Sequence, residues 1–460
     1  MSVSIKSIVD EINRLPDFEQ FGTVSSVLGM LIEVDGIDGL LSIGDRCWII
    51  TKKTKNLMCQ VIGFKNNKAL VMPYGTLEGI SLGCKVLIDP HEPVIYPHLS
   101  WLGRVINAFG EPIDDKGPLI KGSKPCLIQN NPPEAHKRQR LGDKIDLGVR
   151  VMNSFLTLCK GQRMGIFAGS GVGKSTLLSM MARHTTADVN LIGLIGERGR
   201  EAREFIEDDL GERGMERSVV VVATSDEPPL VRRQAAYLTM AVAEYFRDQN
   251  NDVLCLMDSV TRFAMAQREI SLSMGEPPAT RGYTPTVFAE LPRLLERAGP
   301  GVLDQGTITG IFSVLVEGDD YNEPTSDSVR GIIDGHVVLD RAIAERGRYP
   351  AVNILKSVSR TLPDCNSNEQ NKIIERAKKL VSIYEDMAEL IRLGAYREGS
   401  DPKVDEAIHY YESIEGFISQ RKNEYTSLDD CYSNLASILD LVHEPESLSK
   451  NINELSKPSG

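Results

Sequence analysis

The sequence predicts an α/β domain with a parallel sheet, preceded by a small strand-rich domain and followed by a helical one. Short β-type runs fill the early part of the chain, apolar strand-like runs alternate with helical stretches in the middle, and the end is polar and helical. We therefore expect an N-terminal helix at 1–18, a β-domain at 19–89, an α/β domain at 90–365 and a helical domain at 366–460.

The composition is that of a soluble globular protein. The 460 residues include 41% hydrophobic and 25% charged side chains, and the formal net charge is −12. This acidic balance argues against a broad nucleic-acid surface, because phosphate neutralisation needs clustered Lys and Arg. The eight cysteines form no Cys-x-x-Cys pair and are interpreted as structural thiols of a reducing compartment. With no membrane-length apolar run and no signal peptide visible, we expect a cytoplasmic protein.

The first segment, 1–18, is predicted to form an amphipathic helix that ends at Pro16. Its apolar side chains recur at helical spacing, at Ile5, Ile8, Val9, Ile12 and Leu15. Such a helix either packs on its own domain or detaches to dock a partner protein, and its terminal position favours the partner slightly.

The β-domain is predicted from short runs of Val, Ile and Leu that are separated by Gly, Asp and Asn. This spacing indicates a small β-barrel or a sandwich. Few aromatic residues interrupt these runs, which is unlike a single-strand nucleic-acid binder. The predicted strands are 23–32, 46–50, 57–64, 69–72 and 85–88.

The α/β domain is predicted from near-continuous apolar runs, as in a parallel sheet that is covered on both faces. Helical stretches at 201–210 and 231–247 fall between them and indicate right-handed crossovers. The predicted strands are 164–167, 191–195, 219–224, 253–257, 309–316 and 337–339. Beyond it, polar helices are expected at 371–393, 405–423 and 428–443, with a frayed tail after Pro445.

The most informative motif is a glycine-rich loop at 168–176, between a strand-like run and a helix-like one. In that context the loop turns its N–H groups around a polyphosphate, and the following helix adds its positive end. Lys174 reaches the β- and γ-phosphates, and Ser175 offers a hydroxyl to Mg²⁺. Ala168 replaces the usual first glycine, a mild change. The residues expected to bind phosphate are Gly169, Ser170, Gly171, Val172, Gly173, Lys174, Ser175 and Thr176.

Two carboxylates at predicted strand ends accompany this loop. Asp258 ends an apolar run and is expected to hold Mg²⁺ through its water shell, the alternative being that it caps the next helix. Glu197 is placed to polarise an attacking water, and Arg198 to meet charge on the phosphoryl oxygens. An ordinary charged helix start, with Glu197 and Glu201 paired to arginines, is an equal alternative.

Tyr349 and Arg360 are further candidates with open alternatives. Tyr349 either stacks on adenine or is simply half-buried. Arg360 either forms a structural salt bridge or reaches a neighbouring subunit's nucleotide as an arginine finger.

Several motifs resemble those of the ATPases of type III protein export, relatives of the catalytic subunit of rotary ATP synthase. The resemblance covers about 22–420 and is greatest to the flagellar branch, at Gly282-Tyr-Thr-Pro-Thr-Val-Phe and Val316-Glu-Gly-Asp-Asp-Tyr-Asn-Glu-Pro; the injectisome branch is the alternative. The shared motifs are Gly196-Glu-Arg-Gly-Arg-Glu, Asp258-Ser-Val-Thr-Arg-Phe, Gly275-Glu-Pro-Pro-Ala-Thr-Arg-Gly-Tyr, Leu291-Pro-Arg-Leu-Leu-Glu-Arg-Ala-Gly and Ser357-Val-Ser-Arg.

This resemblance implies a RecA-like P-loop NTPase core with an N-terminal β-barrel and a C-terminal helical domain. It implies ATP and Mg²⁺ as cofactors, with Ser175 and Asp258 serving Mg²⁺ and Glu197 activating water. Tyr349 would stack on adenine, and Arg360 would enter the neighbour's site.

The resemblance also implies partners. It indicates a homohexamer, a regulatory stator-like export protein on the first helix, and a coiled-coil stalk at the central pore near 275–283. An export gate at the inner membrane, export substrates and chaperones would be further partners, and nucleic acid would not.

Three other classes compete with an export ATPase. A hexameric nucleic-acid translocase shares the core fold but conflicts with the acidic charge. A non-catalytic subunit of a rotary complex has no use for the carboxylate of Glu197. The ATP synthase catalytic subunit itself is disfavoured by the export-type motifs.

Overall fold

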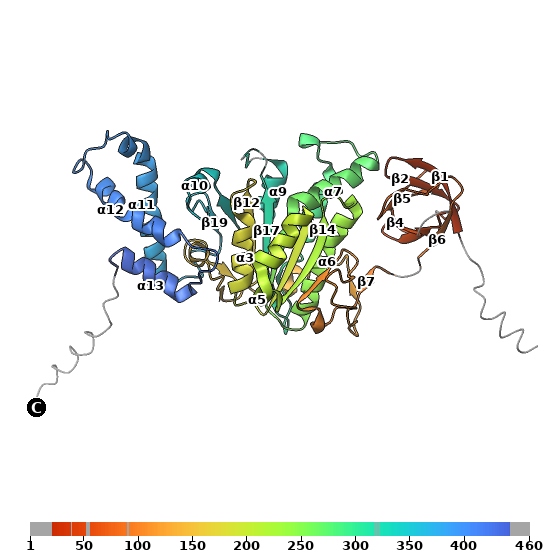
Figure 1. The fold of residues 1–460 in the computed structure, drawn as a ribbon, viewed down its shortest axis with the longest axis horizontal. Helices are drawn as coiled ribbons and strands as arrows, with labels where there is room; N and C mark the ends of the chain where they lie inside the picture. The colour runs from red at the N-terminus through yellow and green to blue at the C-terminus, as the bar shows by residue number, and fades with distance from the viewer. Residues whose placement is uncertain are drawn as a thin grey trace, which may run out of the picture.

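The computed structural model describes residues 21–37, 39–51, 56–89, 92–316, 318, 320–321 and 323–441. Figure 1 shows a central sheet covered by helices, with a β-barrel at one end of the molecule and a helical domain at the other. The predicted fold class is confirmed. The helix expected at 1–18 and the tail after Pro445 lie outside the described residues.

The N-terminal domain is a closed barrel in the order β1-β2-β5-β4-β3-β6, which excludes the sandwich. Burial alternates along β2 and β3, as expected when one face of each strand points into a barrel. The single strand predicted at 23–32 is instead the hairpin of β1 and β2, because Gly29 takes a positive φ of 59°. The strands are Phe21–Leu28, Leu31–Asp35, Arg46–Ile49, Leu57–Lys65, Lys68–Pro73 and Lys85–Ile88.

The segment that joins the barrel to the core consists of short elements. One of its strands, β8, extends the edge of the main sheet by pairing in parallel with β14 (Ser218–Thr224). The elements are β7 (Val94–Ile95), η1 (Leu99–Trp101), β8 (Arg104–Ile106), β9 (Cys126–Leu127), η2 (Ala135–Lys137), β10 (Lys144–Ile145), α2 (Arg150–Asn153) and β11 (Leu158–Cys159).

The core is a 9-stranded sheet in the order β19-β18-β12-β17-β15-β13-β14-β8, with β16 paired to β17. The strands from β18 to β8 are parallel, whereas β19 and β16 are antiparallel additions. The bounds are β12 (Arg163–Ala168), β13 (Val189–Glu197), β14 (Ser218–Thr224), β15 (Val253–Asp258), β16 (Gly299–Pro300), β17 (Thr307–Leu315), β18 (Gly335–Leu339) and β19 (Val358–Ser359).

Two hydrophobic cores cover the two faces of this sheet. Ile166 and Phe167 are successive residues of β12, yet they belong to different cores. The core of Phe167 includes residues of α6 (Pro229–Asp248), α7 (Val260–Ser273) and α8 (Pro285–Leu295), whereas the core of Ile166 includes residues of α3 (Lys174–His184) and the C-terminal helices. The helix predicted at 201–210 is α4 followed by a π-helical turn, η3. The core helices are α3 (Lys174–His184), α4 (Gly199–Glu204), η3 (Phe205–Leu210), α5 (Gly211–Met215), α6 (Pro229–Asp248), α7 (Val260–Ser273), η4 (Thr280–Gly282), α8 (Pro285–Leu295), α9 (Pro324–Ile332) and α10 (Arg341–Glu345).

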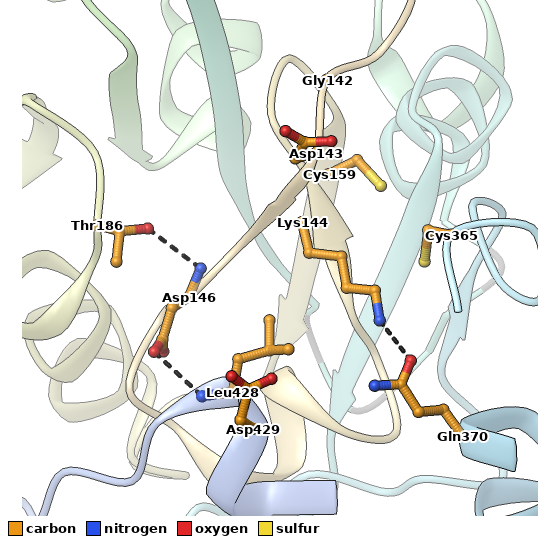
Figure 2. Close-up of a pocket in the computed structure, with 10 residues that line it drawn as sticks. All are labelled: Gly142, Asp143, Lys144, Asp146, Cys159, Thr186, Cys365, Gln370, Leu428 and Asp429. Carbon is orange, nitrogen blue, oxygen red and sulfur yellow. Dashed lines mark hydrogen bonds between the residues drawn. The ribbon is translucent and has the colours of Figure 1, made fainter. Parts of the chain in front are cut away.

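The C-terminal domain contains α11 (Asn368–Arg392), α12 (Pro402–Ile418) and α13 (Leu428–Ile438), so α12 ends earlier than predicted. Figure 2 shows a cavity where this domain meets the core. There Lys144 Nζ donates to Gln370 Oε1 at 2.6 Å, and the backbone N–H of Leu428 donates to Asp146 at 3.1 Å. These bonds attach the domain to the core. Among the described helices, none is both long and apolar enough to cross a bilayer.

Candidate active site

The glycine-rich loop connects β12 to α3 at the carboxyl edge of the parallel sheet. Gly171 and Gly173 have φ of 79° and 87°, which favours glycine at both positions. Val172 is buried and anchors the loop, while Ser170, Gly171 and Ser175 are exposed. Lys174 and Thr176 are partly buried in the first turn of α3. The loop therefore presents backbone N–H groups and a helix N-terminus to solvent, which is the geometry of a polyphosphate site.

Lys174 joins the loop to the two predicted carboxylates. Its Nζ contacts Asp258 Oδ1 and lies 3.5 Å from Glu197 Oε1. Asp258 and Glu197 end β15 and β13, which are neighbours in the sheet. Burial alone would lower the pKa of Lys174, but the two carboxylates raise it above its usual value. The protonated amine of Lys174 thus forms ion pairs with both carboxylates.

Glu197 is poised to accept a proton near neutral pH. Burial is the main cause that raises its pKa to about 7, and the negative charge of Asp258 adds to it. Lys174 acts in the opposite direction. A carboxylate with this pKa at a phosphate loop suits a general base.

Asp258 does not cap the helix that follows it. The N-cap of α7 is Ser259, whose hydroxyl accepts from the backbone N–H of Arg262 at 3.4 Å. Asp258 is 4% exposed, and its Oδ1 also accepts from Ser313 Oγ at 2.6 Å. The carboxylate is therefore fixed beside the loop.

Ser313 was missed by sequence reasoning. It is fully buried in β17 and fixes the orientation of Asp258. A hydroxyl in the middle of the otherwise non-polar run at 310–316 was the available signal.

Arg198 is not brought together with the other candidates. Its side chain is 81% exposed and pairs with Glu201 at 3.1 Å, one turn along α4. The alternative of an ordinary charged helix start is therefore confirmed for Glu201, which pairs with an arginine. It is wrong for Glu197, which pairs with Lys174 instead.

Tyr349 lies against the phosphate loop. A Cβ atom on Gly173 would come within 3.2 Å of Tyr349 Cδ1, so the ring covers that side of the loop. The side chain is 44% exposed. A half-exposed aromatic ring beside a phosphate loop offers one face to a planar base.

Arg360 lies at the opposite end of the sheet from the loop. It follows β19, and its backbone N–H donates to the carbonyl of Asp334 at 2.9 Å. Asp334 in turn bonds Arg163, the first residue of β12, whereas the phosphate loop leaves the last residue of that strand. A six-residue strand separates the two by about 17–20 Å. The side chain of Arg360 is exposed. Arg360 therefore does not complete the site of its own chain.

These features define a class of protein. A glycine-rich loop between strand and helix, with a lysine at two strand-end carboxylates in a parallel sheet, is the catalytic core of a P-loop nucleoside triphosphatase.

Comparison with known proteins identifies the family. Family models match at 24–88 (ATP synthase alpha/beta family, beta-barrel domain), 148–359 (the nucleotide-binding domain of that family) and 366–437 (T3SS EscN ATPase C-terminal domain). The flagellum-specific ATP synthase of Caulobacter vibrioides is 56% identical and covers 95% of this chain and 99% of its own.

Two solved structures share the whole architecture. The assembled ATPase EscN of the enteropathogenic E. coli type III secretion system has a TM-score of 0.85 and 37% identity, covering 91% of this chain and 100% of its own. EscN in complex with its central stalk EscO has a TM-score of 0.83 and 36% identity over the same shares. The chain therefore belongs to the type III secretion branch of the ATP synthase alpha/beta family, which includes the flagellum-specific enzymes, and it is an ATPase.

Proposed function

We propose that this ATPase hydrolyses Mg·ATP as a homohexamer and energises export of flagellar proteins through a type III secretion apparatus. The observation that carries the proposal is Lys174, held at the phosphate loop by Asp258 and Glu197. The flagellum-specific relative, at 56% identity, supports the flagellar assignment.

Each residue of the site has a proposed role. Before nucleotide binds, Lys174 neutralises the carboxylates, and it is positioned to turn toward the β- and γ-phosphates. Glu197 accepts a proton from the attacking water, and the ring of Tyr349 stacks on adenine. Arg198 leaves its exposed pair with Glu201 to meet charge on the phosphoryl oxygens.

The chemistry of the residues fits Mg²⁺. The hydroxyl of Ser175 is exposed at the start of α3, and the carboxylate of Asp258 is held beside the same loop. Hard oxygen ligands of this kind suit Mg²⁺, with Asp258 acting through bound water. When bound, Mg²⁺ neutralises charge that develops on the phosphate oxygens.

Arg360 is proposed to act on the nucleotide of a neighbouring chain. It lies at the far end of its own sheet, so a ring that places this end against the next phosphate loop would build each site from two chains. In-line attack on the γ-phosphate then depends on assembly.

The proposed partners follow the relatives. A coiled-coil stalk is expected at the central pore, because EscN has been solved with its stalk EscO. The loop at 275–283, which Arg281 ties to Asp320 at 2.8 Å, is proposed to face that pore. We further propose a stator-like regulator on the first helix, peripheral association with the inner-membrane export gate, and delivery of substrates with their chaperones.

Phosphate release from Mg·ATP, measured over a wide range of protein concentration, tests this function. Specific activity should climb with concentration, because each site needs a second chain. Arg360→Ala should lower activity by about a thousandfold or more while the chain still folds, since an arginine finger contributes that much to turnover. Full activity of Arg360→Ala at saturating protein would exclude the shared site.

A further inference from the structure

A glutamine outside the phosphate site, Gln162, forms hydrogen bonds to the segment that carries Arg360. Gln162 immediately precedes β12, and its side chain is fully buried. Its Nε2 donates to Ser359 Oγ at 3.0 Å, and its Oε1 accepts from Thr361 Oγ1 at 3.0 Å. One amide group therefore binds the residues directly before and directly after Arg360.

The backbone of Arg360 itself is held at the same place. Gln162 Nε2 also lies 3.2 Å from the carbonyl oxygen of Asp334, and that oxygen accepts the N–H of Arg360 at 2.9 Å. Asp334 Oδ2 is in turn fixed by the backbone N–H of Arg163 at 3.0 Å. The side chains on both sides of Arg360 and its own backbone N–H are thus held by Gln162 and Asp334, beside the first residue of β12.

This attachment matters because the Arg360 side chain is long and exposed. A flexible guanidinium loses conformational freedom when it binds a phosphoryl group in a fixed geometry. A fixed backbone leaves only the side-chain torsions to be ordered. The hydrogen bonds of Gln162 therefore lower the entropic cost of placing the Arg360 guanidinium against the phosphoryl group in the transition state.

We propose that Gln162 is a positioning residue for the arginine finger, acting through Ser359 and Thr361 on the site of the neighbouring chain. The inference rests on the proposed role of Arg360 in a shared site. Its consequence is specific: loss of Gln162 impairs hydrolysis at the neighbour's nucleotide and leaves the chain's own phosphate loop competent.

Mixed assemblies test this directly. Gln162→Met keeps the length of the side chain but cannot form these hydrogen bonds, and alone it should lower kcat at least about tenfold with little change in KM. It is then mixed in equal amounts with Glu197→Gln, which has an intact finger and an inactive site. The mixture should reach about a quarter of wild-type activity per chain, because half the chains keep an active site and half of their neighbours supply an intact finger.

A matched glutamine provides the control. Gln234 is also buried, donates to the carbonyl of Ala108 at 2.8 Å, and lies on α6 rather than beside the finger. Any activity that Gln234→Met loses should not be recovered on mixing with Glu197→Gln. Failure of the same mixing to rescue Gln162→Met would overturn the inference.

Two further variants separate the possible failures. If Arg360→Ala is rescued by mixing and Gln162→Met is not, only the role of Gln162 is wrong; if neither is rescued, the shared site itself is wrong. Should Gln162→Met fail to fold, Thr361→Val removes the hydroxyl that donates to Gln162 while keeping the side-chain shape. Its kcat should fall and recover on mixing, and an unchanged kcat would contradict the proposal.

Discussion

Glu197, the proposed general base, has a raised pKa that affects both activity and stability. Its pKa of about 7 means that half of the free enzyme carries a protonated base at that pH. We predict that kcat/KM for Mg·ATP falls tenfold per pH unit below about pH 6, because the water then lacks a proton acceptor. A pH profile of phosphate release checks this. A profile that stays flat down to pH 5 would exclude Glu197 as the base.

The same shift predicts how stability changes with pH. The folded pKa of Glu197 lies above its unfolded value, so the folded state binds more protons between the two values and stability falls as pH rises through that window. Glu197→Gln cannot ionise. It should therefore unfold at higher temperature than wild type at pH 8 and lose this advantage near pH 4.5. Glu204→Gln, at an exposed ion pair, is the control and should change little at either pH.

Tyr349 offers a prediction about nucleotide affinity. Tyr349→Ala should raise the Kd for nucleotide about tenfold, because stacking of a base on an aromatic ring is worth about 1–3 kcal/mol. Tyr349→Phe retains the ring and should bind nearly as wild type. Titration with a fluorescent ATP analogue measures both, and equal affinity of the Ala and Phe variants would contradict the stacking role.

At this scale the sequence could locate Lys174, Asp258 and Glu197, because each lies in a local motif or at the end of an apolar run. It could not locate Gln162. Its bonds to Ser359 and Thr361 join residues that lie about 200 positions apart in the chain, so only the folded chain reveals these contacts.

Among the elements, α11 depends on a cap that can be tested. Ser367 accepts from the N–H of Gln370, and Gln370 reaches back to the N–H of Ser367. Ser367→Ala should destabilise the protein by about 1 kcal/mol without changing the kcat per assembled site. Thermal unfolding measures this. Ser433→Ala, on the exposed side of α13, should stay within about 0.5 kcal/mol of wild type.

The core strands were the most predictable elements. Buried parallel strands such as β13 and β15 consist mostly of apolar residues, and their predicted positions are confirmed to within a few residues. Turns and helix ends were less predictable. The turn at Gly29 divides the predicted strand 23–32, but no cluster of polar residues marks it in the sequence. Helix α12 ends at Ile418, although the residues that follow are compatible with a helix.

Charge gives a prediction for the whole molecule. With a net charge of −12, the chain should show no stimulation by RNA or single-stranded DNA at physiological salt. Phosphate release with and without each nucleic acid checks this. A severalfold rise would favour the translocase alternative.

With the proposed shared site, the separation of the phosphate loop from Arg360 also determines how many sites an assembly can complete. A chain with these two parts at opposite ends of one sheet joins others head to tail, so an open row always leaves one loop and one arginine unmatched. Turnover per chain would be about one half of the closed-ring value in a pair and about five sixths in an open row of six. Activity per chain thus reports how far the ring has closed.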